Sequence, residues 1–247
     1  MLADWAGMDI KREQQQFRNS KPSMLGRGIE RLTHPFGKAI ASVVPKSVIE
    51  KVLTGLDKAV AVPALVTFGH DRSDLEACHA AALRVSRAAR SVSATTGAAA
   101  GFGGAISMGA DIPATIAIAL RVIRDTGRAY GFDGEGDAEK LFRLQILELS
   151  ALDDPKMRDQ RIAALEAGID ADGDLVNPDH EHITPIVDQM VERVSRAIAF
   201  RSFQSRAGMV VPVVGSVVGG IVNSSFQKDV GRAARFAFQA RRLRDER

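Results

Sequence analysis

The sequence predicts an all-α fold: a single helical domain with two Gly/Ala-rich apolar helical hairpins packed together. Signals for helix starts recur along the chain, whereas no run of alternating polar and apolar residues is bounded by hairpin turns. The composition, 45% hydrophobic and 26% charged, is that of a folded globular protein. Two long apolar stretches, residues 91–120 and 207–227, are built from small side chains, which favours closely packed helices.

Helix starts are predicted by capping patterns. Ser73-Asp74-Leu75-Glu76 is a capping box ahead of residues 77–92. Asp154-Pro155 and Thr184-Pro185 each place a capping residue before a proline at the first helical position. We expect a helix to begin at each of these three places.

The middle of the chain alternates helices and loops. Residues 131–137 are too rich in Gly and Asp to continue a helix, and residues 168–182 form a long polar connector. Between them, Asp137 can cap a helix that carries one apolar stripe, formed by Leu141, Leu144, Leu147 and Ala151. No low-complexity linker divides the chain, which favours one domain.

The first apolar stretch contains a single charge, Asp111. A membrane-spanning helix needs about 20 apolar residues, and an Asp near the bilayer centre costs roughly 2.5–3.5 kcal/mol. Ile112-Pro113 is expected to interrupt the helix and restart it there. We interpret Asp111 as the N-cap of that second helix, and the alternative is a carboxyl of raised pKa that serves proton chemistry.

Basic residues flank both apolar stretches. Arg84, Arg87 and Arg90 precede the first stretch, and Arg121, Arg124 and Arg128 follow it. A hairpin returns both clusters to one side, as the positive-inside preference requires, whereas a single span would translocate three arginines. Arg206, Lys228 and Arg232 flank the second stretch in the same way, so hairpins that dip into a membrane or pack in a core are favoured over spans.

Glycines spaced four apart predict how these hairpins pack. The small-xxx-small spacing lets two helix backbones approach closely, in lipid or inside a protein. Two interpretations stay open: a glycine-faced hairpin pair that shelters lipid or another apolar ligand, and a buried helix pair in a soluble core. For the first, the candidate ligand-binding residues are Gly97, Gly101, Gly104, Asp111, Pro113, Gly215, Gly219 and Gly220.

No catalytic residue, metal ligand or cofactor site is assigned from the sequence. Asp170, Asp172, Asp174 and Glu181 match the carboxylate positions of a calcium-binding EF-hand loop, but Leu175 replaces the required glycine. A solvated acidic loop is favoured, and calcium binding stays open.

His180 and His182 point apart on a helix, and no nucleotide-binding or nucleophile motif is present. The lone Cys78 cannot form an intramolecular disulfide, and we expect it to be a buried structural thiol.

Charge is distributed unevenly, with an acidic segment at 133–192 and a basic one at 193–247. Nucleic acid is not an expected partner, because only Phe236 and Phe238 accompany the C-terminal arginines. Helical spacing predicts that Phe236 packs on the core while Phe238 faces outward. Phe238 is then the candidate for contact with lipid, and a merely solvated face is the favoured alternative. Charge reversal of the neighbouring Arg235, Arg241 and Arg242 is then expected to weaken binding to anionic liposomes and leave the fold intact.

Two segments resemble the hallmark regions of the EcsC protein family. Residues 101–133 combine a Gly-rich apolar run, Asp-Ile-Pro, an aliphatic helix and the turn Tyr-Gly-Phe-Asp. Residues 212–238 hold a second apolar segment and KDVGRA, which repeats the RDTGRA pattern of residues 124–129. The resemblance covers roughly residues 60–245. It predicts an N-terminal helical extension over residues 1–55 and an EcsC-like helical domain over residues 56–247.

The family takes its name from a protein encoded beside an ABC transporter, and its members are largely bacterial. The resemblance implies a helical, membrane-associated protein and brings no catalytic residues. One hypothesis is a non-enzymatic protein that binds lipid between its hairpins and meets an anionic membrane. The alternative is a soluble scaffold or accessory protein for a transporter or another membrane protein, without a ligand. The N-terminus lacks a secretory signal pattern, so we expect a cytoplasmic protein, peripheral at the inner face of the membrane under the first hypothesis.

Overall fold

The computed structural model describes residues 2–20, 63–101, 108–152, 154–176 and 215–245. In these ranges the chain forms six helices: α1 (Leu2–Asn19), α4 (Leu75–Gly101), α5 (Met108–Ala129), α6 (Asp137–Ala151), α7 (Pro155–Ala167) and α9 (Gly215–Asp245). The described residues contain no strand, and one isolated bridge joins Ile169 to Leu175. The predicted all-α, single-domain fold is confirmed.

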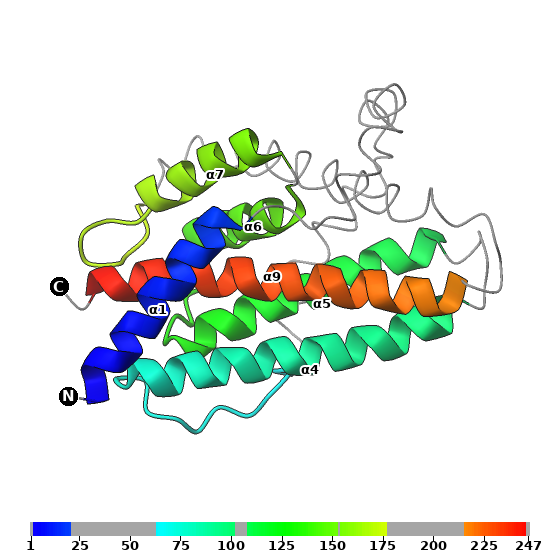
Figure 1. Cartoon of the computed structure of the whole chain (residues 1–247), viewed down its shortest axis with the longest axis horizontal. Coiled ribbons are helices and arrows are strands. Elements are labelled where there is room, and N and C mark those ends of the chain that lie inside the picture. The colour runs from blue at the N-terminus through cyan, green and yellow to red at the C-terminus, as the bar shows by residue number, and fades with distance from the viewer. Residues whose placement is uncertain (1, 21–62, 102–107, 153, 177–214, 246–247) are drawn as a thin grey trace.

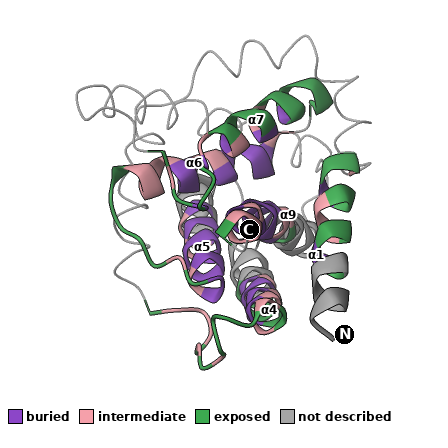
Figure 2. Cartoon of the chain, turned by 90° about the vertical axis from the view of Figure 1, so that its left-hand side faces the viewer, coloured by how far each residue is buried: buried purple, intermediate pink, exposed green. Residues whose placement is uncertain are grey.

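The C-terminal helix α9 is the centre of the fold. It lies along the long axis of the molecule with α4 and α5 beside it (Figure 1). Figure 2 looks along this axis and shows α4, α5, α6 and α1 around α9, with α7 outside α6. Every residue of α9 from 233 to 239 is buried. Charged and polar side chains within residues 233–239 have no access to solvent, so they must find partners inside the protein.

Capping carboxylates start two of the helices. At α7 the prediction is confirmed, because Asp154 Oδ1 accepts hydrogen bonds from the backbone N–H groups of Lys156 (2.8 Å) and Met157 (3.0 Å), with proline at the first helical position. At α4 the predicted capping box is wrong by one residue. Asp74 Oδ1 accepts the N–H groups of residues 76 (2.9 Å) and 77 (3.2 Å), whereas the Ser73 hydroxyl donates to Asp71.

The helix α6 begins without a side-chain cap. Asp137 is its first residue and not its cap, because the preceding Gly136 takes the N-cap position at φ 126°. The predicted apolar stripe is present: Leu144, Leu147 and Ala151 are buried and Leu141 is half-buried. The helix is enclosed more fully than one stripe requires, since residues 146 and 149 are buried as well.

The turn at residues 130–132 ends α5 through a Schellman motif. Gly131 has φ 91°, a conformation that glycine adopts without the steric cost of a side chain. The N–H of Phe132 donates to the carbonyl of Gly127 (2.9 Å), and the N–H of Gly131 donates to the carbonyl of Arg128 (3.1 Å). The Tyr-Gly-Phe-Asp turn of the sequence is therefore a helix stop.

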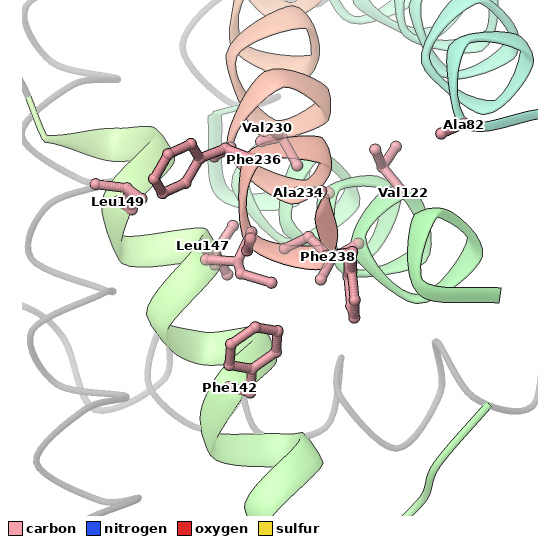
Figure 3. Close-up of a cluster of buried hydrophobic side chains, with 14 of the residues drawn as sticks. Ala82, Val122, Phe142, Leu147, Leu149, Val230, Ala234, Phe236 and Phe238 are labelled. Carbon is pink, nitrogen blue, oxygen red and sulfur yellow. The ribbon is translucent and has the colours of Figure 1, made fainter. Parts of the chain in front are cut away.

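The core combines small residues on α4 and α9 with aromatic rings from α6 and α9. Figure 3 shows Ala82, Val122, Phe142, Leu147, Leu149, Val230, Ala234, Phe236 and Phe238 in this cluster. The Phe238 ring packs against Phe142 at a centroid distance of 5.5 Å and against Phe132 at 5.9 Å. Alanines in the α4–α9 contact let the two backbones approach closely, and the rings fill the wider space toward α6.

The first apolar stretch supplies the C-terminal part of α4 (residues 91–101) and the N-terminal part of α5 (residues 108–120). These two helices pack against each other and against α9. The α5 helix begins at Met108, so Asp111 and Pro113 lie inside its first two turns. The predicted restart at Pro113, with Asp111 as its N-cap, is therefore wrong. Pro113 is the sixth residue of α5 and lies beyond the first four N–H groups, so it removes one intrahelical hydrogen bond without ending the helix.

The second apolar stretch is described only from residue 215, where α9 begins. Its first leg, and with it the second predicted hairpin, lies outside the described residues. Thr184-Pro185 and the two histidines at 180 and 182 lie there too. Within the parts of the chain that the structure describes, no helix is long and apolar enough to cross a membrane.

Candidate functional site

The last turns of α4 and the first turns of α5 and α9 lie together at one end of the bundle, opposite the chain termini (Figure 1). We call residues 91–101, 108–120 and 215–227 the small-residue end. The predicted ligand-binding residues lie there: Gly97 and Gly101 on α4, Asp111 and Pro113 on α5, and Gly215, Gly219 and Gly220 on α9, whereas Gly104 lies outside the described residues. The structure thus gathers their helix segments, and their role in ligand binding stays a prediction.

A buried polar network lies nearer the other end, between α1, α4, α5 and α9. Its central carboxylate is Glu13 on α1. Arg235 Nε donates a hydrogen bond to Glu13 Oε1 (2.9 Å), and Arg235 NH2 lies 2.8 Å from the same oxygen. The other oxygen, Oε2, accepts a hydrogen bond from Gln239 Nε2 (2.7 Å). Arg235 also donates from NH1 to Ser86 Oγ on α4 (2.9 Å). Two guanidinium nitrogens of Arg235 thus share one oxygen of Glu13, and the opposite charges strengthen this contact.

The hydroxyl of Tyr130 extends this network to α5. It accepts a hydrogen bond from Gln239 Nε2 (3.1 Å) and lies 3.1 Å from His79 Nδ1 on α4. The Tyr130 side chain is buried, whereas His79 and Glu13 are about one-quarter exposed at the edge of α1. The network therefore runs from the interior of the bundle to its surface.

Burial dominates the electrostatics of the network. It raises the pKa of the Tyr130 phenol, and it lowers the pKa of His79 despite the nearby Glu13 carboxylate. Burial alone would also raise the pKa of Glu13, but the charge and hydrogen bonds of Arg235 outweigh it and hold that pKa below its usual value. At neutral pH the network thus contains a carboxylate, a guanidinium and a neutral imidazole whose Nδ1 can accept from the Tyr130 hydroxyl.

These groups fasten α1 to the bundle. Gln14 Nε2 donates to the Phe236 carbonyl (2.8 Å), and the Phe17 ring stacks on the Phe236 ring at 4.5 Å. Arg158 of α7 lies 4.1 Å above the Phe17 ring and donates to the Phe17 carbonyl (2.8 Å). Because both oxygens of Glu13 are already engaged, the arrangement supports a structural role for the network more than general-base chemistry.

Sequence reasoning missed this network. It singled out neither Glu13 nor His79, because the network residues lie far apart in sequence, on α1, α4 and α9 and directly after α5. A weak signal was available: Gln239 and Arg235 lie one turn apart on a helix otherwise rich in apolar residues.

The predicted lipid-facing side of the C-terminal helix is wrong. Phe238 is buried between α5 and α6, and Arg241 beside it is also buried. Arg241 NH1 pairs with Glu139 at 2.7 Å, and its guanidinium lies 3.9 Å from the centre of the Phe132 ring. The prediction that Phe236 faces the core is confirmed. Phe238 turns inward as well because α6 covers the side of α9 that the sequence assigned to solvent.

The acidic loop after α7 is folded on itself. Asp170 Oδ1 accepts the N–H groups of Asp172 (3.0 Å) and Asp174 (2.9 Å), so this carboxylate stabilises the loop backbone. Glu181 lies outside the described residues. Across the described ranges, no three His, Cys, Asp or Glu side chains are grouped as a metal site would require. Cys78 is a free, buried thiol, as predicted.

Comparison with known proteins settles the family. A model of the EcsC protein family matches residues 9–243. The chain belongs to the EcsC protein family. Its relatives include Protein EcsC of Bacillus subtilis (strain 168), 23% identical over 91% of this chain and 90% of the relative. Another is the uncharacterized protein YdbA of the same organism, 27% identical over 60% of this chain; the match covers only 51% of YdbA. No solved structure matches.

The family match begins at residue 9 and so extends into the segment predicted to be an N-terminal extension. The predicted boundary at residues 55–56 lies outside the described residues, and the division into two regions stays a prediction. Within the EcsC hallmark region, the structure gives residues 125–131 structural roles. Asp125, for example, is buried beside Arg124 (2.7 Å) and accepts the N–H of Leu65 (2.6 Å).

Proposed function

We propose that this EcsC-family chain is a non-enzymatic, membrane-associated protein that holds lipid or another apolar ligand at its small-residue end. The observation that carries the proposal is the convergence of three apolar segments, distant in sequence, at one end of the bundle (Figure 1). Asp111 is the only charged residue in these segments. An end so poor in charge is suited to an apolar environment, because contiguous apolar surface is unfavourable in water.

The composition of these segments also suits a ligand between helices. Small side chains either let helix backbones close up or leave space that an acyl chain can fill. A ligand in such a space would be bound through the burial of its apolar surface, and this requires no catalytic group. On this proposal the protein lies at the inner face of the membrane.

A direct test is to purify the protein without detergent, extract it with organic solvent and identify co-purified lipid by mass spectrometry. Flotation with liposomes then measures membrane association. We expect stoichiometric lipid in the extract and co-flotation of the protein. Absence of both would overturn the proposal and favour the alternative, a scaffold or transporter accessory protein that covers this end with a protein partner.

Variants at the small-residue end connect the binding to the site. Gly97→Leu on α4 and Gly219→Leu on α9 each add an isobutyl group to a helix of this end. We expect either change to reduce co-purified lipid several-fold at unchanged helix content. Gly69→Leu is the control, because an added Cβ at Gly69 meets nothing within 4 Å and this residue lies outside the three segments. Equal lipid in all three variants would place the ligand elsewhere.

A further inference from the structure

Exposed basic side chains lie where the small-residue end joins the rest of the bundle. Arg84 and Arg87 lie on the outward side of α4, in line with Ala80 and Ser91, and all four are exposed. The opposite side of α4, which includes Val85, packs in the core. Between residues 77 and 101 this helix contains no Asp or Glu. The exposed charge of α4 within residues 77–101 is therefore entirely positive.

Two basic residues of α9 lie at the same level along the bundle. Gly231 of α9 lies against Ser86 of α4, where an added Cβ would be 2.5 Å from Ser86 Oγ. These two residues therefore lie at the same level along the bundle. Arg84 and Arg87 lie within one turn of Ser86, and the exposed Lys228 and half-buried Arg232 lie within one turn of Gly231. We call Arg84, Arg87, Lys228 and Arg232 the basic collar.

The distance from the basic collar to the tip of the bundle matches one leaflet of a bilayer. From Arg87 to the end of α4 at residue 101, a rise of about 1.5 Å per residue covers roughly 21 Å. From residue 228 back to the start of α9 at residue 215, the same rise covers roughly 20 Å. Half of a bilayer that is about 40–45 Å thick with its headgroup regions is about 20–22 Å. With the tip near the bilayer midplane, the basic collar would lie among the lipid headgroups.

We infer that the basic collar binds the headgroups of anionic phospholipids, so that the protein selects negatively charged membranes. This inference rests on the proposed function, since it presupposes that the small-residue end enters the membrane. Long basic side chains reach from the end of an apolar segment to the phosphate level, and each adds electrostatic attraction to an anionic surface. The collar, and not the C-terminal arginines, supplies this charge, because Arg235 and Arg241 are buried in ion pairs.

The test compares vesicles of phosphatidylcholine alone with vesicles that contain 30 mol% phosphatidylserine, using the full chain. The variant is Arg84→Gln/Arg87→Gln, and its control is Lys156→Glu, which lowers the net charge by the same two units. Lys156 is exposed on α7, across α9 from α4 (Figure 2). We expect the double variant to bind anionic vesicles about 30-fold more weakly at low salt, and the control to bind like wild type.

The possible outcomes distinguish failure of this inference from failure of the proposed function. Equal wild-type affinity for neutral and anionic vesicles would overturn the inference and leave the proposed function standing. An equal loss in the variant and the control would reduce the effect to net charge and also overturn it. No binding to either vesicle would overturn both. A thermal unfolding midpoint near the wild-type value shows that the double variant is folded, as expected for two exposed side chains.

Discussion

Gly231 on α9 lies directly against Ser86 on α4. A Cβ atom at Gly231 would be 2.5 Å from Ser86 Oγ, a distance that Cβ atoms do not adopt, and 3.2 Å from Ser86 Cβ, which is tighter than most contacts. Ser86 Oγ cannot turn away without loss, because it donates to the carbonyl of Ala82 (3.2 Å) and accepts from Arg235 NH1 (2.9 Å). The absence of a side chain at Gly231 therefore sets how closely α4 and the central helix approach.

We predict that Gly231→Ala destabilises the protein by roughly 1–3 kcal/mol, as overpacking in a tight core does. Alanine gains about 1 kcal/mol of helix propensity over glycine, so the steric cost must exceed that gain. The free energy of unfolding in urea measures the net effect. Gly69→Ala is the control and should stay within about 0.5 kcal/mol of wild type, because nothing lies within 4 Å of its added Cβ. A Gly231→Ala variant as stable as wild type would contradict the close contact.

The glycine of this contact belongs to a pattern that is visible in the sequence. Gly231 and Gly127 occupy the same position in the repeated hexapeptides KDVGRA and RDTGRA. Gly127 also permits a close approach, since a Cβ there would be 2.8 Å from the tip of the Phe238 ring. Each copy of the repeat is a run of consecutive residues, so the repeat can be recognised from the sequence. The same holds for the Asp154 cap and the apolar stripe of α6. These features depend on neighbours in sequence, and they were found.

Features that depend on neighbours in space were not found. Helical periodicity assigned Phe238 to an outer face on the assumption that the C-terminal helix has one. The helix α9 is enclosed by other helices, so its periodicity says little about exposure. The network of Glu13, His79, Tyr130 and Gln239 joins four helices, and nothing in the spacing of these residues predicts their meeting.

Protonation of Glu13 should loosen the N-terminal helix. Its pKa is lowered in the folded protein, so the stability it contributes is fully present above its unfolded pKa and is lost as the pH falls through the lower folded value. In Glu13→Gln we expect reduced stability at pH 7 and a smaller loss of stability below about pH 4.5 than in wild type. Urea unfolding from pH 7 to pH 3 measures both. Glu76→Gln, at an exposed position on α4, should leave the stability at pH 7 unchanged. Parallel pH profiles for wild type and Glu13→Gln would contradict the prediction.

Tyr130 should ionise only when the protein unfolds. Burial raises the pKa of its phenol, so the folded state favours the protonated form, and stability is lost as the pH rises above the unfolded value of about 10. Because the chain has a single tyrosine, absorbance at 295 nm reports this group alone. We expect the absorbance rise to coincide with the loss of helical circular dichroism. Tyrosinate formation near pH 10 with the helical signal intact would show that the hydroxyl is open to solvent.

Charge reversal of Arg241 should unfold the protein and not merely weaken membrane contact. The Arg241 guanidinium is buried, pairs with Glu139 (2.7 Å) and donates from Nε to the carbonyl of Gly173 (3.0 Å). Arg241→Glu would place two carboxylates together in the interior, and breaking a buried pair alone costs roughly 3–5 kcal/mol. We expect a large drop in the free energy of unfolding, or failure to fold.

Three further variants distinguish loss of the buried ion pair from a change of charge alone. Lys228→Glu makes the same change at an exposed position of α9 and should leave the stability within about 0.5 kcal/mol of wild type. Arg241→Met/Glu139→Met removes both charges, so no unpaired carboxylate stays buried, and it should recover much of the stability lost in Arg241→Met alone. Urea unfolding of the four variants measures these differences. An Arg241→Glu protein as stable as Lys228→Glu would mean that Arg241 faces solvent, as helical periodicity alone predicts.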